Sequence, residues 1–232
     1  MGDQYVYLSS TGIKISNPKA EFALVSHAPE WLITLYNTKT RCFYQTPIDK
    51  WKRDLQARGL TYDVHLKNWN KKGAGQICGL KAIEYVSPNS STFQGQTRMH
   101  TLANADYWTS KDINVPPRLA DLITTAYGLP TSSTVPLRLN CTDNGEPKVM
   151  LDTYYAKQTA IPVSYFEPPA GLTRVKTDAE VMMDDDQKQL VNDMVEQLNN
   201  DTQASAGSTV KLGKYTLPKE KVQKLLDSLK SK

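Results

Sequence analysis

The fold class is decided by the stretch Trp31-Leu32-Ile33-Thr34-Leu35-Tyr36, Asn37-Thr38-Lys39-Thr40, Arg41-Cys42-Phe43-Tyr44-Gln45. Its outer parts are rich in the aromatic and β-branched residues that favour strands, and its middle is polar and turn-forming. The stretch therefore predicts a β-hairpin. Similar segments continue from Tyr5 to about Lys176, and only two short helical segments interrupt them. A sheet this large with few helices to cover it must curl on itself or enclose something. We therefore expect a binding cavity rather than a catalytic cleft.

Two segments between the strands carry helix signals. The first is expected over residues 47–59, because Thr46 is a favourable N-cap, Pro47 suits the first helical position and Gly59 suits the end. The second is expected over residues 117–128. Apolar residues recur at helical spacing on one face of each: Ile48, Trp51 and Leu55 in the first, and Leu119, Leu122, Ile123 and Ala126 in the second.

Further strands are expected along the chain. Asp143-Asn144-Gly145 is typical of a tight hairpin turn, because Asn and Gly tolerate positive φ. Lys71-Lys72-Gly73-Ala74-Gly75 is interpreted as another turn. The expected strands cover residues 5–15, 21–26, 62–66, 76–86, 94–110, 135–141 and 148–158, followed by a short turn or helix at 162–166 and a last short strand after Leu172.

Composition is ordinary for a globular protein, with 39% hydrophobic and 22% charged residues in a chain of 232. That length suits one domain with an appendage. No window reaches the roughly 18 apolar residues that cross a bilayer. The net charge of +4 hides an asymmetry. Residues 178–201 hold eight acidic residues against Lys188, a net of −7, and residues 211–232 hold seven lysines against Glu220 and Asp227, a net of +5.

The composition changes after Lys176, which divides the chain into a sheet domain over residues 1–177 and a helical appendage over 178–232. Amphipathic helices are expected over 184–200 and 218–230, with a flexible linker around 201–208. Their apolar faces could dock a protein partner or a second copy, and the basic end could contact an anionic membrane surface. Nucleic acid is not an expected partner, because the terminal lysines lie among leucines with no aromatic stacking platform.

Residues with catalytic or metal-binding chemistry form no recognisable pattern. His27, His65 and His100 are far apart and are interpreted as solvent-facing strand histidines. Asp184-Asp185-Asp186 is interpreted as negative charge at a helix N-terminus. No P-loop, dinucleotide fingerprint or nucleophile elbow occurs. The sequence therefore predicts no cofactor, no metal and no catalytic residue.

The three cysteines lie in strand-like segments without any Cys-x-x-Cys spacing. Buried thiols are the first interpretation, and a Cys42–Cys78 disulfide is the alternative in an exported protein. No secretory signal opens the chain. Two alternatives stay open: an extracytoplasmic protein, periplasmic or secreted, in which Met1-Gly2 replaces a removed leader, or a cytoplasmic protein.

The order of the expected elements resembles the lipoprotein-localisation carrier superfamily, the LolA/LolB-like proteins that include outer-membrane lipoprotein-sorting proteins. The most specific matches are the strand from Gly79-Leu80-Lys81 to Tyr85, the helix that follows Tyr107-Trp108, and the ending Phe166-Glu167-Pro168-Pro169-Ala170-Gly171-Leu172. The resemblance covers about residues 5–176. It implies an α+β fold: a curved antiparallel sheet forming an unclosed β-barrel, with short helices plugging its concave face, here followed by C-terminal helices.

The resemblance also implies a function. We expect a non-enzymatic extracytoplasmic binding protein whose apolar cavity holds an acyl chain, a lipid or a lipidated partner, with the helix over 117–128 as a movable plug. The expected wall consists of Trp31, Ile33, Leu35, Val64, Leu66, Leu122 and Ile123. A structural or interaction module with a filled core is the alternative, and its C-terminal helices would dock a partner. A hydrolase is the third and weakest alternative.

Overall fold

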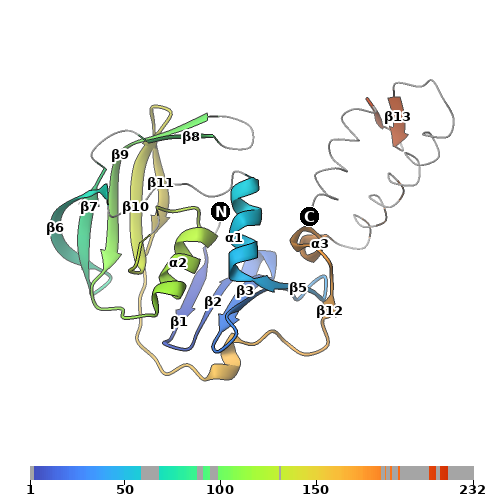
Figure 1. The fold of residues 1–232 in the computed structure, drawn as a ribbon, viewed down its shortest axis with the longest axis horizontal. Coiled ribbons are helices and arrows are strands. Elements are labelled where there is room, and N and C mark those ends of the chain that lie inside the picture. Colours follow the sequence, from blue (N-terminus) through green and yellow to red (C-terminus); the bar gives the residue numbers. More distant parts are fainter. Residues whose placement is uncertain are drawn as a thin grey trace.

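The structure is a computed structural model that describes residues 3–58, 68–87, 91–94, 99–130 and 132–183, together with 186, 189, 193, 209–212 and 215–218. The described chain is α+β, with two six-stranded sheets and few helices (Figure 1). Both of these sheets keep edge strands, so the described strands do not close into a barrel. In the described part of the chain, no helix has the length and apolarity needed to cross a membrane.

The first sheet contains the hairpin that the sequence predicted. Its strands, in spatial order, are β1 (Tyr5–Leu8), β2 (Gly12–Asn17), β3 (Phe22–His27), β4 (Leu32–Asn37), β5 (Cys42–Pro47) and β12 (Thr173–Arg174). Neighbours are antiparallel except β12, which pairs with β5 in parallel. In the hairpin, Leu35 pairs with Tyr44 and Ile33 pairs with Thr46. Cross-strand neighbours share a face, so all four side chains lie on one side of the sheet.

The second sheet is antiparallel and has the order β11-β10-β9-β7-β6, with β8 also paired to β9. Its strands are β6 (Asn70–Ile77), β7 (Leu80–Val86), β8 (Ser91–Gln94), β9 (Met99–Ser110), β10 (Pro136–Asp143) and β11 (Glu146–Asp152). The predicted turn at Asn144-Gly145 is confirmed, and both residues have positive φ. A separate hairpin consists of β13 (Thr209–Leu212) and β14 (Tyr215–Pro218).

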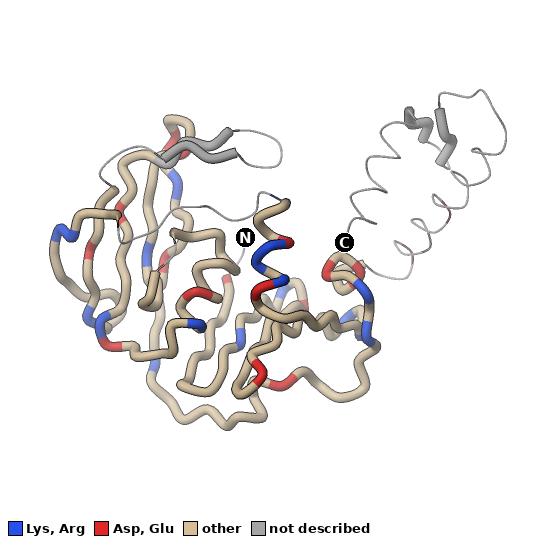
Figure 2. The backbone as a smooth tube through the Cα atoms, in the orientation of Figure 1, with Lys and Arg blue, Asp and Glu red and all other residues tan. Residues whose placement is uncertain are grey.

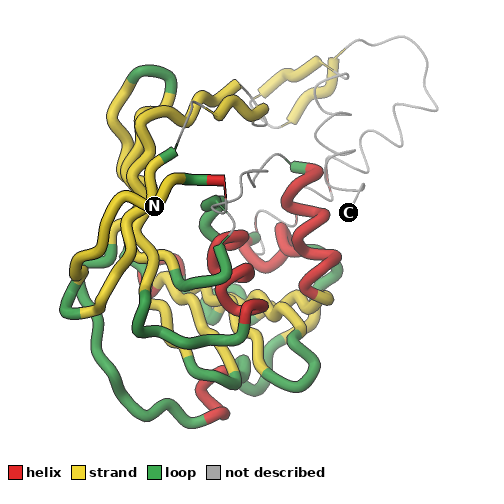
Figure 3. The backbone as a smooth tube through the Cα atoms, turned by 60° about the vertical axis from the view of Figure 1, so that its left-hand side comes forward, coloured by secondary structure: helices red, strands yellow, loops and turns green. Residues whose placement is uncertain are grey.

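Two helices of ten residues, α1 (Ile48–Ala57) and α2 (Pro117–Ala126), confirm the two predicted helical segments. Figure 3 shows the longer helices, in red, together on one side of the strands. The predicted cap of α1 is wrong. Pro47 is the N-cap, because β5 continues through Pro47 and holds Thr46 in the ladder with Ile33. The Thr46 hydroxyl has no hydrogen-bond partner among the described residues. The shorter helices are η1 (Pro18–Ala20), η3 (Val163–Phe166) and α3 (Asp178–Met182).

The main apolar core lies between these two helices and the first sheet. It contains Trp51 of α1, Leu122 of α2 and Ile33 of β4. A second cluster, around Tyr107 and Leu139, lies on the second sheet. The apolar stripes recognised in the sequence therefore face the strands, as amphipathic helices in a globular protein do.

Several strand predictions are corrected. Residues 71–75 lie inside β6, and the turn before β7 is at Cys78-Gly79, where both residues have positive φ. Residues 5–15 are split into β1 and β2 by a turn that Ser9 closes, because its Oγ accepts from the Gly12 amide at 3.1 Å. The strand predicted to reach residue 158 ends at Asp152. The strand over 62–66, the linker around 201–208 and most of the helices over 184–200 and 218–230 lie outside the described residues.

None of the three cysteines forms a disulfide, so the Cys42–Cys78 alternative is wrong. Cys42 is buried on β5 of the first sheet, whereas Cys78 is exposed in the β6–β7 turn of the second. The Sγ of Cys78 donates to the carbonyl of Thr153 at 3.1 Å. The prediction of buried thiols in strands is confirmed for Cys42 and Cys141 and fails for Cys78.

Candidate functional site

The candidate site is the apolar surface between α2 and the first sheet, where the predicted ligand wall lies. Ile33, Leu35, Leu122 and Ile123 belong to one cluster, and Trp31 packs against it. The other two predicted wall residues, Val64 and Leu66, lie outside the described residues. The structure therefore brings together all five of the predicted wall residues that it describes.

Local sequence explains this convergence. Ile33 and Leu35 are two apart on β4, and side chains two apart on a strand point to the same face. Leu122 and Ile123 are on the buried stripe of α2, which faces β4 across the cluster. The two ten-residue helices and the strands thus contribute to one continuous aliphatic surface.

The wall is closed against solvent in the described residues. Ile33 and Leu122 are 0% exposed, Ile123 is 2% exposed and Leu35 is 5% exposed. Trp31 is only half-buried, as are Tyr44 and Tyr127, which also pack against the cluster. The site therefore has a filled aliphatic centre and an aromatic margin.

An ion pair connects the two helices at their exposed sides. Nζ of Lys52 on α1 lies 2.6 Å from Oδ2 of Asp121 on α2. Both side chains are about one-third exposed. Ion pairs in contact with water contribute less than about 1 kcal/mol. The charged link between the helices is therefore weak compared with the apolar contacts beneath it.

Two phenols lie beside the apolar core. The hydroxyl of Tyr107 on β9 is buried and donates to the Pro130 carbonyl at 3.2 Å. Burial raises the pKa of Tyr107 and also that of Tyr127, which follows α2. Both groups therefore stay neutral at ordinary pH and contribute aromatic surface rather than charge.

A carboxyl pair that the sequence did not indicate lies on the opposite face of the second sheet. Asp106 alternates with Tyr107 on β9 and therefore points away from the Tyr107 cluster. Its Oδ2 accepts from Nε1 of Trp108 at 3.1 Å, and Glu84 is its carboxyl neighbour. Desolvation raises the pKa of Asp106, and Glu84 raises it further. Lys72 pairs with Glu84 at 2.6 Å. Only the β7–β9 register, which the sequence does not show, brings these groups together.

Tyrosines gather on the face of the first sheet that α1 and α2 do not cover. Tyr7 of β1 packs edge-on against Tyr165 of η3, with ring centroids 4.9 Å apart. Lys14 Nζ of β2 lies 4.2 Å from the centroid of the Tyr165 ring. Tyr154 and Tyr155, which follow β11, are 67% and 68% exposed.

A groove of about 530 Å³ lies on the edge of β5, next to the strand that carries Ile33 and Leu35 of the predicted wall. It contains none of the predicted wall residues. Its lining combines apolar, polar and basic residues and consists of Tyr44, Gln45, Thr46, Pro47, Lys50, Arg174, Val175 and Lys176.

The described residues contain no group of three or more His, Cys, Asp or Glu side chains that could hold a metal ion. Nδ1 of His27 is 2.8 Å from the carbonyl oxygen of Ala28, and the side chains of His65 and His100 lie outside the described set. Comparison with protein-family models gave no match, and comparison with curated proteins gave none either.

Proposed function

We propose that the protein is a non-enzymatic extracytoplasmic binding protein whose two sheets form an unclosed, curved wall, plugged on its concave face by α1 and α2. Its ligand is the acyl chain of a lipid or of a lipidated partner, and the chain enters between α2 and the strands. The observation that carries this proposal is the continuous aliphatic cluster shared by α1, α2, β2, β3 and β4. Such a surface recognises a hydrocarbon chain through burial, which contributes about 0.8 kcal/mol per methylene.

Access requires α2 to move. Its wall residues Leu122 and Ile123 are almost completely buried, so an acyl chain takes the place of the α2 side chains against the strands. Apart from these apolar contacts, α2 is linked to α1 by the Lys52–Asp121 pair, whose side chains are about one-third exposed. A ligand that offers equivalent apolar contacts can therefore replace the helix at a small electrostatic cost. Half-buried Trp31 lies at the margin of the opening.

Uptake is tested first on protein purified without detergent. Native mass spectrometry is expected to show co-purified lipid, or else the lipid-free protein is expected to bind a fluorescent fatty acid that unlabelled fatty acid displaces. Neither bound lipid nor displaceable binding would contradict the proposal.

The location of the ligand is tested with a brominated fatty acid, which quenches tryptophan emission at short range. The Trp31→Phe variant is expected to lose a large part of the quenching. Trp108→Phe is the matched control, because Trp108 lies in a separate cluster with Ile77, Ala82 and Leu137. Equal losses in the two variants would place the ligand elsewhere.

The role of α2 as a plug is tested by weakening its link to α1. Asp121→Asn is expected to speed fatty-acid uptake, because it removes the ion pair with Lys52 without changing the apolar wall. Asp152→Asn is the control, because it breaks the exposed Arg138–Asp152 pair across β10 and β11. Unchanged uptake rates in both variants would show that α2 does not move for binding.

The proposed absence of catalysis has its own test. A panel of ester, phosphate and glycoside substrates is expected to show no turnover. Turnover that His65→Ala, His100→Ala or Asp106→Asn abolishes would contradict the proposal, Asp106 being included because it has a carboxyl neighbour in Glu84.

A second candidate function is an interaction module, and the filled centre of the predicted site favours it, with its described wall residues other than Trp31 at most 5% exposed. Its test is deletion of residues 184–232. The truncation keeps α3, because Val181 is fully buried and its carbonyl accepts from the Thr40 hydroxyl at 2.8 Å. A full-length protein that takes up no fatty acid and loses self-association on truncation would support this second function over the first.

A further inference from the structure

The groove beside β5 has a clear structural origin. The hydrogen-bonded ladder between β5 and β12 ends where the amide of Val175 donates to the carbonyl of Phe43 at 2.8 Å. The later residues of β5, the chain at 174–176 and Lys50 of α1 together line the groove. The opening is therefore built between elements that are held at fixed positions by the sheet.

One end of the groove region is fastened by an ion pair. Nη2 of Arg58, at the end of α1, lies 2.6 Å from Oδ2 of Asp178, the first residue of α3. Both side chains are four-fifths buried or more, so this pair is better shielded from water than the two other pairs that involve α1, Lys50–Asp54 and Lys52–Asp121. It ties α1 to the chain that leaves the groove, and it keeps the two sides from separating.

All the charged residues that line the groove are basic. Its eight lining residues include Lys50, Arg174 and Lys176 and no acidic residue. No ion pair within the described residues involves Arg174 or Lys176. Figure 2 shows basic residues on both α1 and the segment after β12. Basic residues from two separate elements therefore line one opening.

Lys50 stays charged in this setting. Its Nζ lies 2.7 Å from Oδ2 of Asp54, one turn further along α1. The hydrogen bond to Asp54 raises the pKa of Lys50, with smaller contributions from Tyr44. Lys50 therefore offers a persistent positive charge beside the Tyr44 phenol.

Two residues of β5 that carry hydroxyl groups also line the groove. Thr46 is 4% exposed, and its hydroxyl has no partner among the described groups. The Tyr44 phenol lies on the same face of β5, two residues away. A buried hydroxyl without a partner is unfavourable, and an anion that accepts from it would satisfy it.

We propose that this groove binds a phosphate monoester or a phosphate diester, with Arg174 and Lys176 on one side of the phosphoryl group and Lys50 on the other. A phosphoryl group offers several oxygens that can be contacted from both sides at once, and the guanidinium of Arg174 can donate two parallel hydrogen bonds to it. A lipid headgroup and a soluble phosphate compound share this chemistry. The inference does not rest on acyl-chain binding, because the predicted wall and the groove share no residue.

The first experiment is calorimetric titration of the full chain with glycerol 3-phosphate and with inorganic phosphate. Saturable binding is expected in the wild type, and Arg174→Gln with Lys176→Gln is expected to weaken it by about tenfold or more, since each lost charged hydrogen bond contributes about tenfold. These substitutions are on exposed side chains, and circular dichroism checks that the variants fold.

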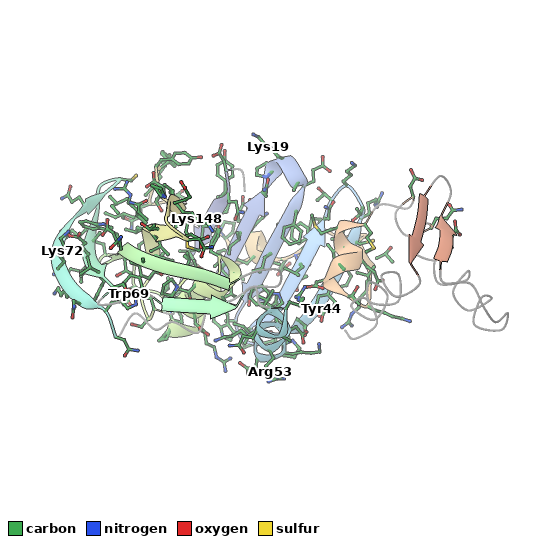
Figure 4. The ribbon with its side chains drawn as sticks, turned by 90° about the horizontal axis from the view of Figure 1, so that it is seen from above. Lys19, Tyr44, Arg53, Trp69, Lys72 and Lys148 are labelled. Carbon is green, nitrogen blue, oxygen red and sulfur yellow. The ribbon has the colours of Figure 1, made fainter. Side chains whose placement is uncertain are left out.

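Arg53→Gln is the matched control. Arg53 is three residues after Lys50 on α1 and does not line the groove. Figure 4 shows Arg53 on the outer side of α1, while Tyr44 lies beside the helix next to the sheet. Affinity is expected to change by less than about twofold in this control. An equal loss in Arg53→Gln and in the groove variant would overturn the proposal, because binding would then follow net charge alone.

The source of the phosphate is separated by sedimentation with vesicles. Phosphatidylglycerol in phosphatidylcholine is expected to bind the wild type and not the groove variant if the ligand is a lipid headgroup. Soluble phosphate binding without vesicle binding would assign the groove to a free phosphate compound. No saturable binding of either kind would overturn the inference. Displacement of fluorescent fatty acid in the same variants is expected to be unchanged, so failure here is distinct from failure of the proposed carrier function.

Discussion

The two faces of the first sheet are covered in different ways. On one face, Ile13 and Ile33 meet the ten-residue helices α1 and α2 in an aliphatic cluster. On the other, the four-residue η3 places Tyr165 over Tyr7 and Lys14, and Phe166 over Gly12. The same strands supply both faces by alternation, yet one cover is broad and aliphatic and the other is narrow and aromatic.

The difference shows that the packing on each face of a sheet depends on the area of the segment that covers it and on where that segment lies in the chain. A helix of ten residues brings an apolar stripe that buries several strand residues together. A short 3-10 segment brings only one or two side chains, so each must be large and must fit closely, as Phe166 does at 0% exposure. Substitutions on the two faces should therefore destabilise the protein for different reasons. On the face covered by α1 and α2 they leave a cavity, and on the face covered by η3 they cause a steric clash.

The largest effect is expected on the helix-covered face. Leu122→Ala should lower the free energy of unfolding by about 2–5 kcal/mol, because it leaves a cavity in a fully buried cluster. Urea unfolding measures it. Val163→Ala is the control on the other face, where Val163 is 51% exposed, and it should change stability by less than about 0.5 kcal/mol. Similar values for both variants would mean that the cluster is not packed around Leu122.

The next effect tests the close fit on the η3 side. A Cβ at Gly12 would lie 2.5 Å from Cδ2 of Phe166, so Gly12→Ala should destabilise by about 1–3 kcal/mol through displacement of the ring. Gly73→Ala is the control, because its Cβ would lie 3.5 Å from Glu84 Oε2, an ordinary contact. Thermal unfolding measures the stability of both variants. Equal stability of Gly12→Ala and Gly73→Ala would show that Phe166 does not pack on Gly12.

A smaller effect is expected from the ion pair that joins the two covering helices. Asp121→Asn should lower the free energy of unfolding by about 0.2–1 kcal/mol, because the pair with Lys52 is in contact with water. Raising the salt concentration should reduce the difference from the wild type, because salt screens exposed charges. A loss above about 2 kcal/mol at high salt would contradict a purely electrostatic link.

The last effect concerns the tyrosines of the face that η3 covers and appears only at alkaline pH. The hydrogen bond with Tyr7, followed by burial, raises the pKa of Tyr165 to about 12 from an ordinary value of 10.0. The folded state therefore holds the phenolic proton more tightly than the unfolded state. The resulting stability is fully present below pH about 10 and is lost as pH rises toward about 12.

Urea unfolding across this pH range measures the loss. The wild type should lose stability more steeply than Tyr165→Phe, although the raised pKa values of Tyr107 and Tyr127 act in the same direction in both proteins. Parallel pH curves for the two proteins would mean that Tyr165 titrates normally in the folded state.

Local patterns in the sequence were sufficient for much of the fold. The hairpin at Trp31–Gln45, the turn at Asn144-Gly145 and both ten-residue helices follow from residue types at fixed spacings. The failures lie where a local signal in the sequence competes with a packing requirement from another strand. Gly73 and Gly75 suggested a turn, but these glycines lie inside β6, where a Cβ at Gly75 would be 3.0 Å from the Trp108 ring. A packing requirement from another strand, invisible in the local pattern, explains that glycine.

The candidate sites also differ in whether the sequence could predict them. The predicted wall residues Ile33, Leu35, Leu122 and Ile123 meet in one cluster because apolar periodicity on β4 and α2 marks the faces that must leave water. The groove and the Asp106–Glu84 pair could not be predicted. Lys50 and Arg174 are more than 120 residues apart in sequence, and only the parallel pairing of β12 with β5 brings them to one opening.

The sequence by itself determined the central hairpin, both ten-residue helices, their apolar faces and the absence of a local catalytic motif, because these depend on residue type and on spacings of a few residues. The tertiary structure alone decided the pairing of distant strands, the filling of the space between α2 and β4, and the gathering of Lys50, Arg174 and Lys176 around one groove. Strand register and edge pairing depend on contacts between residues far apart in the chain, and local propensity carries no information about them.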